Sequence, residues 1–345
     1  MKNIFFILLL VLLMASGIFL LKNKSDVKKQ TLEVKKKNIN TNPLSVELMR
    51  TEKFPGSDIK IEETLDPGSN YKRYIISYLS EGLKIYGLLT VPSGEKPKNG
   101  WPAIIFNHGY IPPDQYSPTE RYIAYVDYFA MNGYIVLKSN YRGNGQSEGQ
   151  PEGAYYSPAY AVDILNAVSS IKKFKDADPN KIGMWGHSMG GNITLRDLTV
   201  KPNDIKAAVI WGGVVGSYDD LLNNWQRRVP FRPGPTEMAL RNRYRQNLTK
   251  QFGAPKTNPV FWNAIDPTYF LKDITAPIQL HHGESDEEVP LAFSQSLFEK
   301  LKSMNKKVEL YTYPGADHNI SQGFNLAMER SLQFFDKYLK GGESK

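Results

Sequence analysis

The chain has 345 residues, a formal net charge of +8 and no cysteine. Thiolate metal sites are therefore excluded, and the length suffices for one large α/β domain. Residues 1–40 carry a net charge of +6 and residues 217–262 a net charge of +5, which leaves −3 for the remainder. Because the body is not basic and no nucleic-acid motif is present, we expect no nucleic-acid partner.

The N-terminus is an apolar run from Ile4 to Leu21, which is just long enough to span a bilayer. We interpret residues 1–21 as an uncleaved membrane anchor with an extracytoplasmic catalytic domain. The alternative is a cleaved signal segment and a secreted protein. Lysines after the run argue against export under the positive-inside rule. Residues 22–43 are rich in lysine and asparagine and predict a flexible stalk, and residues 44–345 form the expected catalytic domain.

From residue 71 onward, strand-like and helix-like segments alternate along the chain. Strands at 71–79 and 83–91 are joined as a hairpin at residues 80–82. The other expected strands are 102–106, 134–139, 181–185, 207–211, 278–282 and 308–312. The expected helices are 122–131, 159–174, 191–198, 291–303 and 324–340. Such alternation builds a mostly parallel sheet with helices on both faces.

The most informative segment is the G-x-S-x-G sequence at residues 186–190, which has a strand before it and a helix after it. A serine on such a turn presents its hydroxyl at the top of the sheet, and the surrounding glycines let neighbouring backbone approach. We interpret Ser188 as a nucleophile, with a plain structural turn as the alternative. The backbone N–H of Met189, the next residue, is one expected oxyanion-hole donor.

A base and an acid are expected downstream of Ser188, because α/β-hydrolases order their triads as serine, acid and histidine. His318 is the candidate base, since it lies in a turn-rich loop after a strand-like run. The alternative is an exposed polar loop residue. The candidate acids are Glu284, Asp286 and Glu287, which follow a strand that ends at a glycine turn. The alternative for acidic residues without a catalytic role is that they lie in solvent at the N-terminus of a helix, where negative charge is favourable.

At these points the sequence closely resembles the α/β-hydrolase superfamily. The superfamily pattern H-G-x-x-D-x-x-V-P is matched by His282, Gly283, Asp286, Val289 and Pro290. The resemblance selects Asp286 as the acid that orients His318. It also assigns the second oxyanion-hole donor to the backbone N–H of Tyr110, in the His-Gly-x motif after the strand at 102–106. His108 would then be a positioning residue.

Residues 140–149 (NYRGNGQSEG) resemble the Y-R-G-x-G-x-S loop in the catalytic domain of the prolyl oligopeptidase family. Residues 178–183, before the serine turn, resemble that family too, and the likeness covers roughly residues 70–340. The family carries a long β-propeller before the hydrolase, whereas only about 70 residues precede it here. This difference favours the related short esterases.

Residues 217–262 interrupt the alternation where this superfamily inserts lids, and we expect a helical lid there. Its aromatic residues could line a pocket or merely pack the insertion, and they are Trp225, Phe231, Phe252, Phe261 and Trp262. Arg241 and Arg245 lie four residues apart and would share one face of a helix. We expect the lid to admit small substrates and to favour acidic ones, with a solvated arginine face as the alternative.

The sequence therefore predicts an α/β-hydrolase that cleaves acyl bonds. Ser188 would attack, His318 would transfer the proton, Asp286 would orient His318, and Tyr110 and Met189 would stabilise the oxyanion. The expected substrate is a small carboxylic ester, and the alternative is a short peptide cleaved by a serine peptidase. No cofactor or metal is expected, because dinucleotide, phosphate-loop and H-E-x-x-H motifs are lacking. A catalytically silent binding module is a further alternative, whose signature would be a lost triad residue.

Overall fold

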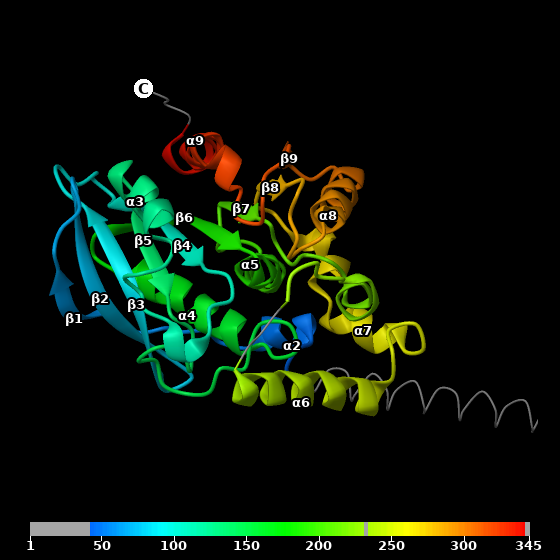
Figure 1. Cartoon of the computed structure of the whole chain (residues 1–345). Helices are drawn as coiled ribbons and strands as arrows, with labels where there is room; N and C mark the ends of the chain where they lie inside the picture. The colour runs from blue at the N-terminus through cyan, green and yellow to red at the C-terminus, as the bar shows by residue number, and fades with distance from the viewer. Residues whose placement is uncertain (1–41, 231–233, 342–345) are drawn as a thin grey trace, which may run out of the picture.

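The computed structural model describes residues 42–230 and 234–341. Within these residues a nine-stranded sheet crosses the domain in the order β1-β2-β3-β5-β4-β6-β7-β8-β9 (Figure 1). The strands are β1 (Lys60–Leu65), β2 (Tyr71–Ser80), β3 (Leu83–Pro92), β4 (Trp101–Asn107), β5 (Ile135–Ser139), β6 (Ala177–His187), β7 (Ala207–Trp211), β8 (Ile278–Gly283) and β9 (Val308–Tyr313). The β1–β2, β2–β3 and β3–β5 pairs are antiparallel, and every pair from β5 to β9 is parallel.

Helices cover both faces of the sheet, as the alternating sequence predicts. The helices are α2 (Val46–Thr51), α3 (Ile123–Met131), α4 (Ala159–Lys173), α5 (Met189–Val200), α6 (Pro235–Phe252), α7 (Pro259–Ile265), α8 (Leu291–Ser303) and α9 (Phe324–Phe335). Buried side chains of α3 and α9 form one core cluster, and those of α4, α5 and α8 belong to the other. The strands between them are apolar and buried because both of their faces are covered. The predicted α/β-hydrolase fold is confirmed.

The hairpin between β2 and β3 turns at the predicted place. Glu81 and Gly82 form its two-residue loop with φ angles of 51° and 81°, and a turn with two positive φ angles suits the twist of paired strands. Two elements that precede the hairpin were not predicted. In β1 most side chains are exposed, so it has no apolar alternation, and α2 is only six residues long.

The 217–262 insertion contains a short helical turn, η2 (Asp220–Asn224), followed by α6 and α7. Helix α6 runs along one edge of the molecule, outside the layers formed by the sheet and by α4 and α5 (Figure 1). The stretch with the two arginines is therefore helical, as expected. Residues 231–233, which include Phe231, lie outside the described residues.

The other aromatic residues of the insertion have two different roles. Phe252 stacks on Phe261 with ring centres 3.7 Å apart, and Phe261 and Trp262 are buried in the main core. These three pack the insertion, as one of the two interpretations predicted. Trp225 instead lines the cavity that contains Ser188.

The expected membrane anchor at residues 1–21, and all but the last two residues of the expected stalk, lie outside the described residues. In the part of the chain that the structure describes, no helix has the length and apolar character needed to span a bilayer. The described chain joins the core at Leu44, which is 2% exposed.

Candidate active site

Ser188 lies on the sharp turn between β6 and α5 with φ 54° and ψ −116°. A positive φ is costly for a residue with a side chain, so the surrounding structure must hold it. The Ser188 N–H donates to the carbonyl of Trp211, and the Ser188 carbonyl accepts from the N–H groups of Gly191 and Val214, each at 3.0 Å. The backbone of the turn is thus fixed on both sides, which leaves the 9%-exposed Ser188 at the wall of a cavity.

The glycines of the turn are required by close backbone approach. A Cβ on Gly190 would lie 1.9 Å from the carbonyl oxygen of Asn107, and a Cβ on Gly186 would lie 2.4 Å from Oγ1 of Thr194. Real Cβ atoms do not approach other atoms so closely. The G-x-S-x-G spacing is therefore explained by packing between the turn, the end of β4 and α5.

The imidazole of His318 contacts the carboxylate of Asp286. His318 Nδ1 lies 2.7 Å from Asp286 Oδ2, and both residues are buried, with 7% and 6% exposed. A proton on Nδ1 that is donated to this carboxylate leaves Nε2 as the basic nitrogen of the ring. Gly212 closes the other side of the ring, because a Cβ there would lie 3.1 Å from His318 Nδ1.

The Asp286 carboxylate has partners for both oxygens. Oδ2 also lies 3.1 Å from His282 Nε2, while Oδ1 accepts the N–H groups of Glu288 at 2.8 Å and Val289 at 2.9 Å. Burial alone would raise the pKa of Asp286, but the hydrogen bonds from His282, His318 and Val289 outweigh burial and hold it well below its usual range. Asp286 is therefore a carboxylate at neutral pH.

The other two candidate acids point elsewhere. Glu284 is exposed and accepts a hydrogen bond from Oγ1 of Thr312 at 2.7 Å. Glu287 is exposed, and its backbone carbonyl accepts the N–H of Arg228 at 2.8 Å. The geometry thus agrees with the residue that the family pattern selected.

Ser188, His318, Met189 and Tyr110 line one cavity of about 140 Å³. Met189 is the first residue of α5, so its N–H has no partner within the helix and is available to a ligand. Gly109, which precedes Tyr110, lies against the serine, because a Cβ on Gly109 would be 3.2 Å from Ser188 Cβ. The structure therefore brings all five predicted site residues together.

A hydrogen-bonded chain behind the cavity was not predicted. Oη of Tyr122 accepts the N–H of Gly109 at 2.9 Å and lies 2.7 Å from His187 Nδ1, while His187 Nε2 lies 3.1 Å from the carbonyl oxygen of His318. Burial lowers the pKa of His187 to about 3, so the ring is neutral. The Tyr122 hydroxyl then donates to Nδ1, and Nε2–H donates to His318. No local sequence signal marks Tyr122, which lies 13 residues after Gly109.

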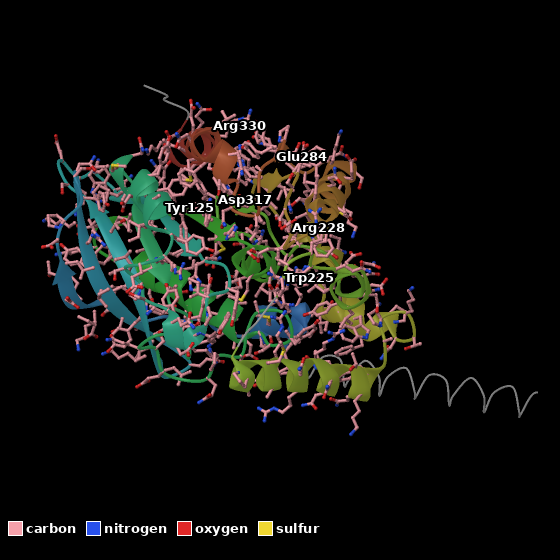
Figure 2. The ribbon with its side chains drawn as sticks, in the orientation of Figure 1. Tyr125, Trp225, Arg228, Glu284, Asp317 and Arg330 are labelled. Carbon is pink, nitrogen blue, oxygen red and sulfur yellow. The ribbon has the colours of Figure 1, made fainter. Side chains whose placement is uncertain are left out.

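The insertion is attached to the turn that carries Asp286. Trp225 Nε1 donates to the carbonyl of Glu288, Arg227 pairs with its carboxylate, and Arg228 Nη2 donates to the carbonyl of Asp286, each within 2.8 Å. In the view of Figure 2, Arg228 is drawn below Glu284, and Trp225 is drawn below Arg228. Glu288 is thus an ion-pair partner in the cavity wall, not a solvated helix end.

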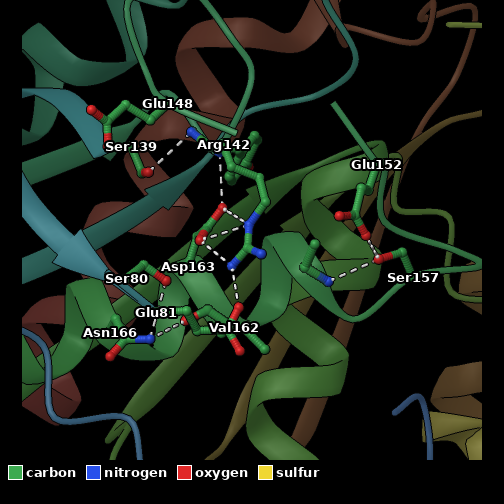
Figure 3. A network of polar contacts seen from close by, with 12 residues as sticks. Ser80, Glu81, Ser139, Arg142, Glu148, Glu152, Ser157, Val162, Asp163 and Asn166 are labelled. Carbon is green, nitrogen blue, oxygen red and sulfur yellow. Dashed lines mark hydrogen bonds and ion pairs between the residues drawn. The ribbon is translucent and has the colours of Figure 1, made fainter. Parts of the chain in front are cut away.

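The YRG loop that carries the family likeness is a structural support outside this cavity. Arg142 is 7% exposed and forms a bidentate contact with the buried Asp163, with the shortest distance 2.7 Å, and a contact with Glu81 at 2.8 Å (Figure 3). A paired, hydrogen-bonded charge of this kind fixes a loop in place. Arg142 therefore ties the loop to α4 and to the β2–β3 hairpin.

Potential metal ligands do not converge in the described part of the chain. No group of three or more histidine, aspartate or glutamate side chains there is placed to hold a metal ion. His281 and His282, adjacent on β8, have separate partners. His281 Nδ1 lies 2.7 Å from Oη of Tyr313, and His282 Nδ1 lies 2.7 Å from Oγ of Ser294.

Comparison with known proteins supports the resemblance. YtmA of Bacillus subtilis (strain 168), an uncharacterized peptidase, is 26% identical over 268 residues, which cover 77% of this chain and 93% of YtmA. Two other relatives are much longer, and the chain spans 35% of the uncharacterized B. subtilis peptidase YuxL and 28% of dipeptidyl peptidase family member 6 of Caenorhabditis elegans.

Solved structures of both peptidases and esterases share the fold. An acetyl xylan esterase from Paenibacillus sp. R4 is 17% identical with a TM-score of 0.63, covering 85% of this chain and 92% of its own. An acylaminoacyl peptidase of Pyrococcus horikoshii is 23% identical with a TM-score of 0.62, covering 81% of this chain and 43% of its own. Residues 121–342 match the sequence profile of the prolyl oligopeptidase family. The chain therefore belongs to the prolyl oligopeptidase family and is a serine hydrolase, either a peptidase or an esterase.

Proposed function

We propose that the protein hydrolyses a small carboxylic ester through an acyl-enzyme formed on Ser188. The observation that supports this most directly is the 2.7 Å contact between His318 Nδ1 and Asp286 Oδ2, beside a serine in the same cavity. Asp286 orients the imidazole so that Nε2 is the base, and it stabilises the imidazolium that forms during the reaction. In this proposal Asp286 remains ionised throughout.

The reaction has two balanced halves. In the first, Ser188 Oγ attacks the ester carbon while His318 takes the hydroxyl proton, and the resulting oxyanion accepts hydrogen bonds from the N–H groups of Tyr110 and Met189. The C–O bond to the alcohol then breaks, and His318 gives its proton to the departing oxygen. In the second half, water attacks the acyl carbon while His318 takes its proton. The bond from that carbon to Ser188 Oγ then breaks, His318 returns the proton to Oγ, and the carboxylic acid leaves.

The size and the walls of the cavity support an ester rather than a long peptide. Its volume of about 140 Å³ is close to the ~150 Å³ of an engineered cavity that holds benzene. The insertion forms part of the wall through Trp225, Arg227 and Arg241. The acetyl xylan esterase that shares the fold has nearly the same length as this chain, which adds support to the esterase assignment.

Cleavage of short peptides is the second candidate function. It is supported by the family and by YtmA, which is described as an uncharacterized peptidase and is matched over 93% of its length. The two functions use the same residues and differ in the leaving group, an alcohol or an amine. The choice between them is therefore a question of substrate, not of mechanism.

A fluorophosphonate probe tests the proposal. We expect stoichiometric labelling of Ser188, and we expect a panel of short-chain esters to compete better than a panel of N-capped di- and tripeptides, including prolyl peptides. Efficient peptide cleavage with little esterase activity would replace the proposed function by the second candidate. An unlabelled protein that turns over neither panel would support the binding-module alternative.

A further inference from the structure

Lys138 is a fully buried lysine to which the proposed reaction assigns no role. It lies on β5 with 0% of its surface exposed, in register with Leu88 of β3 and Phe106 of β4. Because paired residues on neighbouring strands point to the same face, its side chain enters the core cluster that includes residues of α3. A buried ammonium is costly unless it has a partner, so this position calls for a specific contact.

The side chain of Lys138 donates to the backbone carbonyl of Arg121. Within the described residues this carbonyl is its one hydrogen-bond partner, and no carboxylate forms an ion pair with it. Burial, with a smaller contribution from Arg73, lowers the pKa of Lys138 to about 7, and Asp127 partly opposes this effect. Because an ammonium and an amine both carry N–H groups, Lys138 can donate to Arg121 in either protonation state.

The residue that follows this carbonyl is Tyr122, whose backbone is strained. Its φ of 61° and ψ of 23° lie in the left-handed region, at the residue that precedes α3. A bulky residue keeps such a conformation only where the surrounding structure holds it. The Tyr122 carbonyl accepts the N–H of Val126 at 3.1 Å on the helix side. On the other side, the bond from Lys138 holds the peptide group between Arg121 and Tyr122.

The strained backbone directs the Tyr122 hydroxyl to its partners. The hydroxyl accepts the N–H of Gly109 at 2.9 Å and lies 2.7 Å from His187 Nδ1. The fit is close, because a Cβ on Gly109 would lie 2.6 Å from the hydroxyl oxygen. Tyr110, whose N–H is a proposed oxyanion donor, is the next residue. A change in the direction of the Tyr122 side chain would therefore move Gly109 and the donor that follows it.

We propose that Lys138 is a positioning residue for the reaction, which holds Tyr122 in its left-handed conformation and thereby aligns the donor at Tyr110. This inference rests on the proposed function, since Tyr110 has its role there. Lys138 does not line the cavity with Ser188 and acts through the carbonyl of Arg121. A change at Lys138 should affect kcat more than KM, because an oxyanion donor is aimed at charge that develops in the transition state.

The test is a double-mutant cycle of Lys138→Met with Tyr122→Phe, measured on a short-chain p-nitrophenyl ester. Methionine is unbranched and apolar, so it fills the space without a donor. We expect Lys138→Met to lower kcat about tenfold with little change in KM, since a hydrogen bond from a charged group contributes roughly that factor. In the Tyr122→Phe background the same change should cost less than about twofold, because the hydroxyl that Lys138 positions is already missing.

Tyr134→Phe is the matched control. It removes a hydrogen bond of 2.7 Å to Asp336 from the same core cluster, just before β5 begins, and should leave kcat unchanged. Losses of kcat that simply multiply in Lys138→Met and Tyr122→Phe would overturn the proposal. So would an unchanged kcat in Lys138→Met, or an equal loss in Tyr134→Phe.

Hydrogen exchange gives a readout that does not depend on turnover. Exchange in the peptide that contains Gly109, followed by mass spectrometry, should be faster in Lys138→Met and in Tyr122→Phe, but not in Tyr134→Phe. Unchanged exchange in Lys138→Met would overturn the proposal. If the wild type hydrolyses no ester, the proposed function fails, and this measurement alone decides whether Lys138 holds the contact between Tyr122 and Gly109.

Nitrogen NMR of the lysine side chains covers the case in which Lys138→Met fails to fold. The Nζ signal of Lys138 is recognised by its titration near pH 7. Tyr122→Phe should shift this signal, because the two residues share the peptide group of Arg121, and Tyr134→Phe should not. A signal that Tyr122→Phe leaves unmoved would overturn the proposal.

Discussion

His187 and His318 lie with their ring centres 4.6 Å apart, and His187 Nε2 contacts the backbone carbonyl of His318 at 3.1 Å. The residue before the proposed nucleophile is thereby attached to the loop of the proposed base. Through Tyr122 the same chain of hydrogen bonds reaches Gly109, beside the proposed oxyanion hole. Three loops that must stay in register for catalysis are thus connected by two side chains, Tyr122 and His187.

Tyr122→Phe should lower kcat about 30-fold with little change in KM, because it removes a hydroxyl that satisfies two buried groups at about 1 kcal/mol each. We expect slower labelling by a fluorophosphonate as well, since the labelling reaction also needs an aligned Ser188 and His318. Tyr128→Phe is the control and should change neither rate, because Tyr128 lies on α3, which begins just after Tyr122, but outside the cavity. A loss of thermal stability without any loss of labelling rate would assign Tyr122 a purely structural role.

Ser188→Ala should abolish covalent labelling and reduce kcat by about 10⁶-fold, as in other serine hydrolases that lose the nucleophile. The variant keeps the same backbone conformation at position 188, with its positive φ. The melting temperature should therefore stay within a few degrees of the wild type. Ester hydrolysis and mass spectrometry of the labelled protein are the measurements. Near-normal turnover by carefully purified Ser188→Ala protein would show that another residue is the nucleophile.

Asp286→Asn should lower the rate about 10⁴-fold, because an amide favours the wrong tautomer of His318. Glu287→Gln, the adjacent exposed carboxylate, is a matched control and should change the rate less than twofold. Steady-state kinetics on one activated ester compares the two variants. If Glu287→Gln were the more damaging change, the assignment of the acid to Asp286 would be wrong.

His281 should make the folded protein more sensitive to mild acid. Burial lowers its pKa from 6.5 to about 3, so below pH 6.5 the unfolded chain binds a proton that the folded protein excludes. Its contribution to stability is therefore complete above pH 6.5 and is lost as the pH falls toward 3. Between pH 6 and 4, His281→Gln should show a free energy of unfolding that falls less steeply than in the wild type, by about 1.4 kcal/mol per pH unit. Denaturant titrations at several pH values measure both slopes, and equal slopes would contradict the prediction.

A variant that begins at Asn42 should be soluble, folded and as active as the full chain. The core starts at Leu44, and Oγ of Ser45 accepts the N–H of Leu48 at the start of α2, so these residues must be kept. In keeping with the anchor expected at residues 1–21, the full-length protein should sediment with membranes after cell lysis. A soluble mature form that begins near Ile18 would instead identify a cleaved signal segment.

Sequence patterns predicted most of the fold because they reflect local physics. Buried parallel strands are continuous apolar runs, and the turn at Ser188 needs glycines wherever backbone atoms crowd together. Strand β1 escaped prediction because an edge strand with exposed side chains has no apolar alternation. Helix α2 was not predicted for a similar reason, because six residues are too few to show a helical repeat of apolar positions.

Long-range contacts could not be read from local patterns. The three candidate acids lie within four residues of each other, and local composition alone leaves them open. The family pattern selected Asp286, and the fold shows its contact with His318. Tyr122 and Arg228 reach the site through contacts that span 65 and 58 residues, respectively. Likewise, no local pattern separates the aromatic residues of α7, which are buried in the core, from Trp225, which lines the cavity.

The attachment of residues 225–228 to the Asp286 turn has a mechanical consequence. A lid that swung open would have to break the bonds from Trp225 and Arg228 to the very turn that orients the base. Opening and catalysis would then exclude each other at every turnover. We therefore regard this segment as a fixed wall, and we expect a preorganised site that substrates enter by diffusion, with little closing motion to limit the rate.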